Sequence, residues 1–382
     1  MTTLGPASGG SVRGGARDAD RDEIPRTVTL KDVAREAEVH PSTVSRSLDP
    51  FQARRVSTAT RERVLKVAQS MHYRPDLMAS SFRRQRSLTI GVIIPDFGNP
   101  IYAELVRGIS LQLERDGYAA LIVETRDDLD RLQAALTTLE SRKVDGIITA
   151  ATRERDARYL RRVARSGLPV VMAVRWVRSV NLPRVTNDDL RGGTLAAEHL
   201  LSLGHTRLAQ VHGPEDIETF RERCDGFRRA LVHAGLNAPE PADHGEAPTV
   251  DEGRRIMRTI LASRRPHPTG IFAHNDLMAI GAIEALGEAG LRCPEDVSVI
   301  GYNDIPLTEH LDPPLSTIRM PTREVGRIAA QTVLAAVQGT EETATSIALQ
   351  PTLVPRASTA PVGGRQYKRP GRRTSIKRSA HE

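Results

Sequence analysis

The chain is poor in cysteine and has no long apolar run. Its two cysteines, Cys224 and Cys293, lie far apart among 382 residues, and no C-x-x-C motif occurs. A disulfide framework is therefore not expected, and both thiols fit a reducing compartment. No apolar run follows basic residues near the N-terminus, which argues against a secretory signal. No stretch approaches the roughly 20 apolar residues that span a bilayer. These absences predict a cytoplasmic protein that does not associate with a membrane.

Motifs of common enzyme chemistry are missing as well. The sequence has no G-x-S-x-G, no H-E-x-x-H and no Cys/His cluster with metal-ligand spacing. Gly192-Gly193 and Gly287-x-x-Gly290 are not phosphate-binding loops, because no Lys-Ser/Thr follows them. Four histidines fall on different predicted elements and are interpreted as surface or satisfied core residues: His199, His205, His212 and His274. We expect no enzymatic activity, no cofactor and no metal.

Charge is present in excess and is unevenly distributed. Lys and Arg number 54 against 47 Asp and Glu. Residues 27–87 carry 12 basic and 6 acidic side chains, residues 361–382 carry 7 and 1, and residues 1–26 carry 4 of each. The remaining body, 88–360, therefore has a net charge of −5. A basic front on an acidic body favours a protein that binds DNA, since phosphate attracts Lys and Arg.

Residues 29–48 show the spacing of two short helices. Apolar residues recur at i, i+3, i+4 and i+7 in the first, at Leu30, Val33, Ala34 and Ala37. Thr29 precedes it as an N-cap, and Pro41 suits the first position of the second helix. In the second helix the apolar Val44 and Leu48 point one way and the polar residues the other, namely Ser42, Ser45 and Arg46. This pattern predicts a helix-turn-helix whose second helix enters the major groove. A helical hairpin within a larger core is the alternative.

The sequence also predicts a third helix after Ser57 and a tail at each end of the chain. Ser57 is predicted to cap a helix whose apolar side closes the small core with Val64, Val67, Ala68 and Met71, and Pro75 ends it. Residues 1–26 have almost no large apolar side chains and are predicted to be disordered. Residues 357–382 are predicted to form a second disordered tail, basic in character. This tail either adds nonspecific, salt-sensitive DNA affinity or has no role.

From residue 88 onward, apolar runs of strand length alternate with helix-length segments. The runs are 88–95, 118–123, 145–150, 169–174, 208–212, 270–273 and 297–301, and a helix is predicted over 101–115. This alternation predicts an α/β fold with doubly wound parallel sheets. About ten strands are too many for one small sheet, so two similar lobes facing a cleft are expected.

The sequence closely resembles the lactose/galactose repressor family of bacterial transcription regulators. Residues 29–48 read T-L-K-D-V-A-x-x-A-x-V-x-x-S-T-V-S-R-x-L, and His72-Tyr73-Arg74-Pro75 continues the match. Body phrases match too, among them Ile94-Pro95-Asp96-x-x-Asn99-Pro100 and Asn275-Asp276-x-Met278-Ala279-x-Gly281. The resemblance covers residues 28–356 and implies an all-α headpiece over 27–75, a hinge over 76–87 and a two-lobed periplasmic-binding-protein-like core over 88–356. That core would bind an effector and dimerise, and its chain would cross between lobes near 186–187, 316–318 and 345.

For DNA, we predict base contacts from Pro41, Ser42 and Arg46 and phosphate contacts from Thr43 and Ser45. Arg46 has five donors and can bind guanine bidentately or clamp a phosphate. His40 stands where the family usually has a Ser or Asp cap. Because histidine caps poorly, it is expected to face DNA instead. The other predicted contacts are Thr29, Leu30, Arg55, Ala79, Phe82 and Arg83, with Lys31, Arg54, Arg74 and Arg84 as further phosphate candidates.

The resemblance also implies a role in DNA binding for the hinge, residues 76–87. In the family this segment becomes a helix only on operator DNA, where two copies lie in the minor groove and wedge a leucine into a base step. Phe82 occupies the wedge position here, and an inserted Phe can also unstack a step. The alternative is that Phe82 packs on the core beneath.

Open α/β sheets bind ligands at the carboxyl ends of their strands. The candidate effector residues at these ends and on the neighbouring helix are Asp96, Phe97, Asn99, Arg175, Trp176, Arg223, Asn275, Asp276 and Asn303. The resemblance implies that Arg223, three residues before Gly226, grips ligand hydroxyls or carboxylates. Val174 and Asn303 replace acidic residues that are frequent in the family. Trp176 is either a stacking platform or a core residue, and Asp276 either contacts ligand or caps its helix.

Together these features predict a transcriptional repressor that binds a pseudo-palindromic operator as a homodimer, since one headpiece reads too few base pairs to select a site. The expected effector is a sugar or sugar derivative in the cleft. A less hydroxylated or anionic ligand, or control by a protein partner, are alternatives. Rival classes are a solute-binding protein, which the basic front opposes, and a sugar- or nucleotide-processing enzyme.

Overall fold

The computed structural model describes residues 28–48, 55–73, 86–238, 240–263, 266–340 and 346–363. The chain divides into two compact units, Met1–Ser80 and Ser81–Glu382. Six predicted DNA contacts lie outside the described residues: Arg54, Arg74, Ala79, Phe82, Arg83 and Arg84.

The described residues of the first unit form three helices, α1 (Leu30–Glu36), α2 (Pro41–Leu48) and α3 (Thr58–Ser70). At the start of α1, the Asp32 carboxylate accepts hydrogen bonds from the Thr29 backbone N–H at 3.0 Å and from the Thr29 hydroxyl at 2.6 Å. At the start of α3, the Ser57 hydroxyl accepts from the backbone N–H of Thr60 at 3.3 Å. The predicted N-caps Thr29 and Ser57 are therefore confirmed.

A small core joins the three helices. Its buried members are Val33, Ala34, Ala37, Val44, Val64 and Ala68. The other predicted apolar positions, Leu30, Leu48, Val67 and Met71, pack against it half-buried. Helices this short are not stable alone, so this shared core holds the polar outer side of α2 in place.

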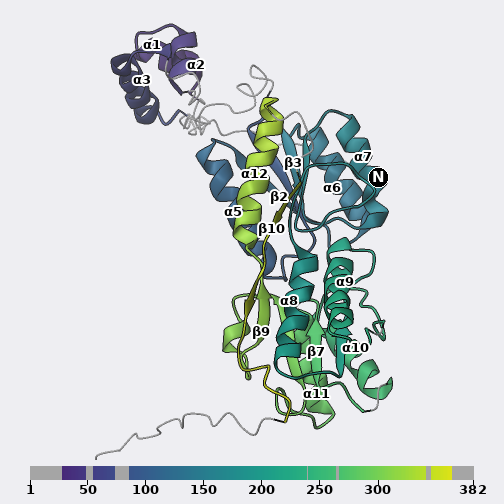
Figure 1. Cartoon of the computed structure of the whole chain (residues 1–382). Coiled ribbons are helices and arrows are strands. Elements are labelled where there is room, and N and C mark those ends of the chain that lie inside the picture. Colours follow the sequence, from purple (N-terminus) through teal and green to yellow (C-terminus); the bar gives the residue numbers. More distant parts are fainter. Residues whose placement is uncertain are drawn as a thin grey trace, which may run out of the picture. The chain divides into compact units, whose positions relative to one another are not determined.

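The second unit consists of two α/β lobes (Figure 1). The N-lobe sheet has the order β10-β5-β4-β3-β1-β2 with all strands parallel. Its strands are β1 (Thr89–Ile94), β2 (Ala119–Glu124), β3 (Gly146–Thr149), β4 (Val170–Ala173), β5 (Arg184–Asn187) and β10 (Ser346–Leu349). Helices α5 (Ile101–Arg115) and α12 (Thr322–Gln338) lie side by side on one face. The other face is covered by η2 (Glu154–Asp156), α6 (Leu129–Ser141) and α7 (Ala157–Arg165).

The C-lobe sheet has the order β11-β9-β8-β7-β6, in which only the β11–β9 pair is antiparallel. Its strands are β6 (Leu208–Val211), β7 (Gly270–Ala273), β8 (Ser298–Asn303), β9 (Ser316–Arg319) and β11 (Thr352–Val354). Helices α8 (Asp189–Ser202) and α9 (Glu218–His233) pack on one face. The other face holds α10 (Val250–Ser263) and α11 (Asp276–Glu288), and η3 (Thr308–His310) follows β8.

The expected α/β class and the two doubly wound lobes are confirmed. Each of the seven predicted apolar runs overlaps a strand, and α5 covers the predicted 101–115. The runs did not include β5, β9, β10 and β11, because polar residues interrupt these four short strands. Within the described parts of the chain, no helix is both long enough and apolar enough to cross a bilayer.

The chain crosses between the lobes three times. Strand β5 ends in the N-lobe and α8 begins in the C-lobe, β9 ends in the C-lobe and α12 begins in the N-lobe, and β10 and β11 belong to different sheets. The first two crossings lie close to the predicted 186–187 and 316–318. The third lies beyond the predicted 345, because the unrecognised β10 occupies 346–349.

The predicted end of the folded body at Arg356 is wrong. Ser358 is fully buried, and its hydroxyl donates to the Val299 carbonyl at 2.6 Å and accepts from the Ser316 N–H at 2.8 Å. The N–H of Val362 still donates to the Leu203 carbonyl at 3.0 Å. Small polar residues gave no periodic signal here, although their backbone is part of the C-lobe.

Helices α8 and α9 cross closely at Gly226. A Cβ added there would lie 1.9 Å from the carbonyl oxygen of Leu190, so Gly226→Ala would force the helices apart. We expect it to lower the free energy of unfolding by about 1–3 kcal/mol. The matched change Gly287→Ala in α11 meets no atom within 4 Å and should be neutral or add up to about 1 kcal/mol. Urea denaturation of both variants measures this, and equal effects would contradict the close crossing.

Candidate DNA-reading helix and interlobe cavity

The outer side of α2 carries Pro41 and four polar residues that are exposed or half-exposed, namely Ser42, Thr43, Ser45 and Arg46. The Arg46 side chain lies back along the helix, where Nε donates to the Ser42 carbonyl and Nη2 to the Ser42 hydroxyl, both at 3.1 Å. Val44 of the same helix is fully buried. Helix α2 therefore presents a polar surface with one guanidinium, a chemistry that suits the edges of bases in a major groove.

His40 has a local role that the sequence did not predict. Its Nδ1 accepts from the Ser42 backbone N–H at 3.2 Å and lies 2.8 Å from the Ser42 hydroxyl. The expectation that this histidine would not cap α2 is therefore wrong, because its ring nitrogen reaches the same N–H that a serine oxygen would. The ring itself is exposed, so contact with DNA stays a prediction.

The remaining predicted DNA contacts of this unit differ in exposure. Thr29, Lys31 and Arg55 are exposed, whereas Leu30 is half-buried against the small core. The Thr29 hydroxyl is held by Asp32, as described above. Nothing in their geometry opposes a contact with DNA.

A small cavity lies where the two lobes meet. Its walls are Asn99, Ile101, Tyr102, Val174, Arg175, Thr219, Phe220, Arg223, Pro248, Asn275 and Asn303. Five of the nine predicted effector residues are therefore brought together: Asn99, Arg175, Arg223, Asn275 and Asn303. The cavity measures only about 20 Å³, room for about one water molecule. A ligand of sugar size would enter only if the lobes or their side chains moved.

Asp96 and Phe97 do not line this cavity. The exposed Asp96 carboxylate accepts from the Gly98 N–H at 2.7 Å, and Phe97 is 62% exposed. The chain turns outward after β1 and returns only at Asn99, which is buried. Of the three residues predicted in this loop, only Asn99 lines the cavity.

Asp276 is a structural residue and not a cavity residue. It is fully buried, and its carboxylate accepts from the Thr317 hydroxyl at 2.6 Å and from the Ile305 N–H at 2.9 Å. Burial raises the pKa of Asp276 to about 7. The N-cap of α11 is Asn275, whose side chain accepts from the Met278 N–H at 2.7 Å. The capping role predicted for Asp276 is therefore wrong, because its neighbour Asn275 caps α11.

Trp176 lies at the lobe junction, outside the cavity. The Arg184 guanidinium sits 3.7 Å above its ring, and its indole N–H donates to the Glu222 carboxyl of the C-lobe helix α9. Trp176 is half-buried. It packs against the buried cluster that contains Leu160 and Val177, as the core interpretation predicted, and it also contacts the C-lobe, which neither interpretation predicted.

Arg223 is held firmly in the cavity wall. Its Nε donates to Asp189 at 2.7 Å and its Nη1 to the His274 carbonyl at 2.5 Å, and its guanidinium lies 3.7 Å from the Tyr302 ring centre. The side chains of Arg223 and Asp189 are 4% and 1% exposed. Burial raises the pKa of the Asp189 carboxyl, and the Arg223 charge opposes this shift. The close α8–α9 crossing places these two groups together.

Arg175 connects the cavity to a salt-bridge network that spans both lobes. Its Nη1 donates to Asp127 at 2.5 Å, and Asp127 also pairs with Arg153 at 3.4 Å. Arg153 in turn bridges to the C-lobe, where it binds Asp216 at 2.9 Å and the Glu246 carbonyl at 3.3 Å. A ligand that pulls on Arg175 would therefore disturb a contact that holds the lobes together.

Two cavity residues have backbone conformations that are unusual for their side chains. Val174 has a φ of 66° and Asn303 a φ of 115°. A β-branched residue at positive φ is strained, and such strain concentrates at binding sites. The Asn303 Oδ1 is buried and has no hydrogen-bond partner among the described residues. It is an acceptor that a ligand hydroxyl or amine could satisfy.

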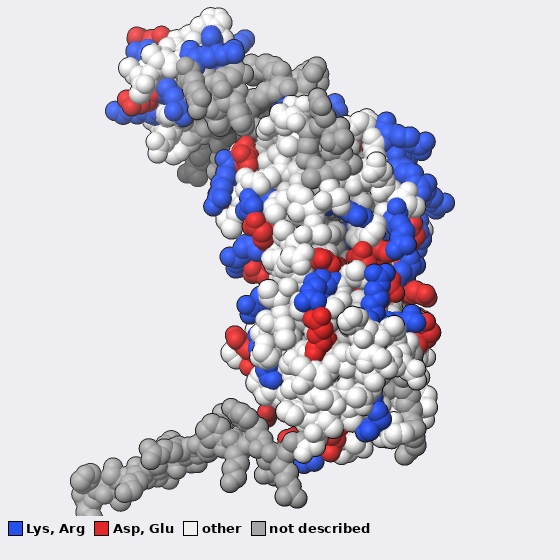
Figure 2. Space-filling model, viewed as in Figure 1, with Lys and Arg blue, Asp and Glu red and all other residues white. Residues whose placement is uncertain are grey.

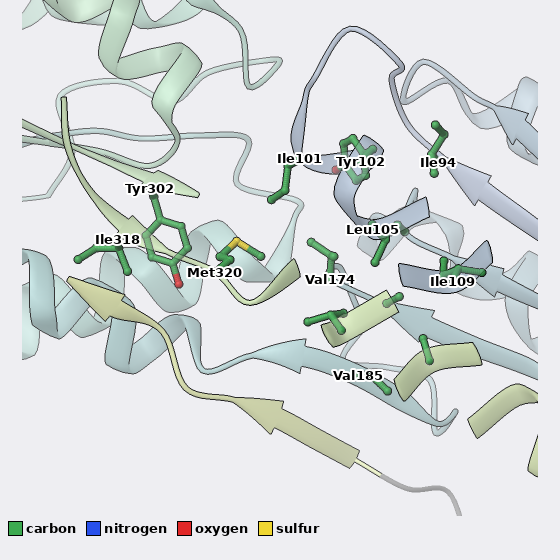
Figure 3. Close-up of a cluster of buried hydrophobic side chains, with 14 of the residues drawn as sticks. Ile94, Ile101, Tyr102, Leu105, Ile109, Val174, Val185, Tyr302, Ile318 and Met320 are labelled. Carbon is green, nitrogen blue, oxygen red and sulfur yellow. The ribbon is translucent and has the colours of Figure 1, made fainter. Parts of the chain in front are cut away.

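Several wall residues were missed by the sequence reasoning: Ile101, Tyr102, Thr219, Phe220 and Pro248. Figure 3 shows Ile101, Tyr102 and Val174 of the N-lobe near Tyr302 and Met320 at the lobe junction. Tyr102 follows Asn99 by one helical turn, which was a usable signal. No sequence pattern marked Thr219, Phe220 and Pro248 as cavity residues, because only the folded C-lobe brings their segments to the cleft.

A histidine cluster lies behind the cavity. The ring centres of His212 and His274 are 4.4 Å apart, and those of His212 and His244 are 4.5 Å apart. His212 and His274 follow different strands and are buried, as predicted, and their rings meet because β6 and β7 are parallel neighbours that end at the same edge. Burial lowers the pKa of His212 to about 4 and the pKa of His274 well below its usual value. No metal-binding group of three side chains exists among the residues that the structure describes.

Glu222 should make stability depend on pH. Burial, with Asp189 and Glu218 nearby, raises its pKa to about 7, although Trp176 and Arg184 oppose the shift. A carboxyl whose pKa is raised on folding stabilises the protein at low pH, and this stabilisation is lost as pH rises through 7. Between pH 5 and 8 the wild-type free energy of unfolding should fall by about 1 kcal/mol relative to Glu222→Gln, after a discount for partial exposure. Thermal unfolding of both proteins at three pH values checks this, and parallel curves would contradict it.

Comparisons with known protein families match the helix-turn-helix unit and much of the two-lobed body. Residues 29–76 match the family model described as bacterial regulatory proteins, lacI family, and residues 197–359 match the periplasmic binding protein-like domain. The chain is 32% identical to the HTH-type transcriptional repressor PurR of Aliivibrio fischeri, over 86% of this chain and 98% of that protein. It is 34% identical to the repressor CytR of Escherichia coli K12, over 87% and 96%.

Solved structures give the same picture. The lac repressor dimer bound to operator and the anti-inducer ONPF superposes with a TM-score of 0.77 at 27% identity, over 88% of this chain and all of that one. A LacI family regulator from Enterococcus faecium with bound ribose gives 0.61 at 32% identity, over 72% and 99%. These relatives are transcriptional regulators and not enzymes. With its helix-turn-helix unit and its two-lobed body, this chain belongs to the lacI family of bacterial regulatory proteins and is a DNA-binding regulator of transcription.

Proposed function

We propose that the protein is a repressor that binds a pseudo-palindromic operator as a homodimer, under the control of a small molecule in the interlobe cavity. The observation that carries this proposal is the meeting of Arg175 from the N-lobe and Arg223 from the C-lobe in one cavity too small for a sugar. Because a ligand must move these walls to enter, ligand binding and lobe arrangement are coupled. The effector would act through this coupling.

On DNA, Pro41, Ser42 and Arg46 would contact bases and Thr43 and Ser45 phosphates, with Thr29, His40 and Arg55 at the edges of the interface. One headpiece with a single short reading helix contacts too few base pairs to select a genomic site, so two copies related by two-fold symmetry are needed. The lac repressor structure is a dimer bound to operator, which supports this arrangement. A protein that works on the chromosome of a bacterium would act in the cytoplasm.

The effector would be a sugar or sugar derivative. Two guanidiniums and three amides suit hydroxyl and carbonyl groups, and the Phe220 ring and Val174 supply an apolar surface. The ribose bound to the Enterococcus faecium relative supports a ligand of this class. The wall has no free carboxylate, since Asp127 and Asp189 are paired with the two arginines. This favours a ligand with fewer hydroxyls, or an anionic one.

The chain would divide into a headpiece over 27–75, a hinge over 76–87 and an effector-binding and dimerising body that begins at 88. The body would extend beyond 356 at least to Val362, because Ser358 is buried and the Val362 N–H bonds to the Leu203 carbonyl. The first and last segments would serve as tails.

The test is an operator-binding assay combined with ligand-induced thermal shifts. Duplex selected from a random pool by the purified protein supplies the operator, and pentoses, hexoses, a disaccharide and nucleosides supply the ligand panel. A true effector raises the melting temperature and changes operator affinity, and by linkage the operator changes effector affinity by the same factor. A ligand that binds this cavity without altering operator affinity would reject the proposal.

A further inference from the structure

A second concave surface lies on the N-lobe, away from the interlobe cavity. Helix α7 and the loop between β4 and β5 enclose a hollow of about 450 Å³. Three arginines line it, Arg158, Arg161 and Arg165, and the opposite wall is formed by Val180, Asn181 and Leu182. Figure 2 shows Lys and Arg gathered on the surface where Figure 1 places α7. The interlobe cavity shares no wall residue with this hollow.

The three arginines bond only to neutral groups. Arg158 donates to the Tyr159 hydroxyl at 2.6 Å, Arg161 to the Ser179 hydroxyl at 3.2 Å, and Arg165 to the carbonyl of Arg161 at 3.3 Å. No ion pair joins any of them to a carboxylate within the described chain. The fourth arginine of α7, Arg162, is by contrast paired with Glu140 at 2.9 Å. The arginines of the hollow therefore retain charge that is not neutralised locally.

The electrostatics of the helix itself do not explain this arrangement. Arginines near a helix C-terminus are favourable, which accounts for Arg165, but Arg158 stands in the first turn of α7, where a cation is unfavourable. Arg158 and Arg161 are three residues apart, and Arg161 and Arg165 four, so like charges face each other along one stripe. Helix α7 contains no acidic residue. An anion in the hollow would relieve this repulsion.

We propose that the hollow binds a small molecule carrying at least two negative charges on phosphate. Guanidiniums bind phosphate oxygens through paired, charge-assisted hydrogen bonds. The volume suits a compact metabolite, the apolar side chains of Val180 and Leu182 face its organic part, and the Asn181 amide adds a polar group. The site is spatially separate from the interlobe cavity.

The loop that walls the hollow also reaches the C-lobe. Arg161 holds Ser179 of this loop, and the neighbouring Arg178 pairs with Glu218 at the start of α9. A ligand that draws Arg161 toward itself would act on the β4–β5 loop, which contacts the C-lobe through Arg178. The hollow is therefore placed to modulate lobe closure from outside the cleft.

Isothermal titration calorimetry with the full-length protein tests the site. The probes are inorganic pyrophosphate and adenosine diphosphate, with sodium chloride adjusted to keep the ionic strength constant. The test variant is Arg161→Gln with Arg165→Gln. The matched control is Arg207→Gln with Arg229→Gln, two exposed C-lobe arginines that also lack an ion pair among the described residues. Arg161→Lys with Arg165→Lys keeps the charge but removes the guanidinium fork.

Both probes should bind the wild type, and affinity should fall about tenfold or more in the Gln variant and several-fold in the Lys variant, while the control stays within about twofold. Absence of binding at constant ionic strength, or equal affinities in the test and control variants, would overturn the proposal. A third arm uses duplex DNA of unrelated sequence. If the Gln variant loses affinity for this duplex but not for pyrophosphate, the surface serves the DNA backbone and the small-molecule site is rejected.

Discussion

Replacing Arg46 by alanine is expected to weaken specific operator binding by about a hundredfold. A bidentate contact between arginine and a base is worth about 1–3 kcal/mol, and a dimer makes it twice. Arg46 lies on the exposed side of α2 while Val44 anchors the other side, so the substitution should leave the headpiece folded. Electrophoretic mobility shift with the selected operator and with unrelated duplex measures both affinities.

The pattern of loss distinguishes a base contact from a phosphate contact. Arg46→Lys keeps the charge and should retain most nonspecific affinity but little specificity, because the ammonium cannot form the paired contact. The matched control is Arg63→Ala on the exposed side of α3, which removes the same charge from the same unit. If Arg46→Ala weakened binding to operator and to unrelated duplex by the same factor, Arg46 would be a phosphate contact and not a base reader.

Arg223→Met is expected to lower the free energy of unfolding by about 3–5 kcal/mol and to abolish the effector response. The substitution leaves the Asp189 carboxyl buried without its partner, which is far more costly than losing an exposed pair. Removing the Arg223 charge should raise the pKa of Asp189 still further. A pKa raised on folding means that stability falls as pH increases, so the deficit of this variant should grow with pH. Chemical denaturation at two pH values tests the size and the sign.

A double variant separates the structural role of Arg223 from its role toward ligand. Arg223→Met with Asp189→Leu removes both buried charges and should recover most of the lost stability. The effector-induced thermal shift should remain absent, because the guanidinium in the cavity wall is still missing. If the double variant regained the effector response together with stability, Arg223 would hold the fold and not the ligand.

The headpiece was predictable because its determinants are local. Two N-caps, a proline at the first position of α2 and apolar residues at helical spacing each act within a few residues, and the structure confirms them. His40 is the exception, since its Nδ1 caps α2 in place of the expected Ser or Asp. Propensity described the average behaviour of histidine, whereas the geometry at this turn brings one ring nitrogen within reach of the Ser42 N–H.

The cavity was predictable only in part. Three cavity residues follow strands, Asn99, Arg175 and Asn275, and Asn303 is the last residue of β8. The carboxyl ends of these strands converge at the lobe junction, so the approach of the four residues follows from parallel topology. Asp276 also follows a strand of this sheet and is nevertheless buried in the C-lobe. Its neighbour Asn275 is the N-cap, so Asp276 is the first residue of α11 and not its cap. A shift of one residue along the chain changes the direction in which a side chain points. The spacing of apolar residues does not fix the start of a helix to a single residue.

By itself, the sequence determined that a basic helix-turn-helix precedes an acidic α/β body with two sheets, because capping, helical periodicity and buried strand runs act over short distances. Only the tertiary structure decided which polar groups share the cavity, that Arg175 reaches the C-lobe through Asp127 and Arg153, and that Trp176 joins the lobes. These contacts unite residues from segments far apart in the chain. They depend on how two lobes with three crossings close on each other, and no local pattern encodes that geometry.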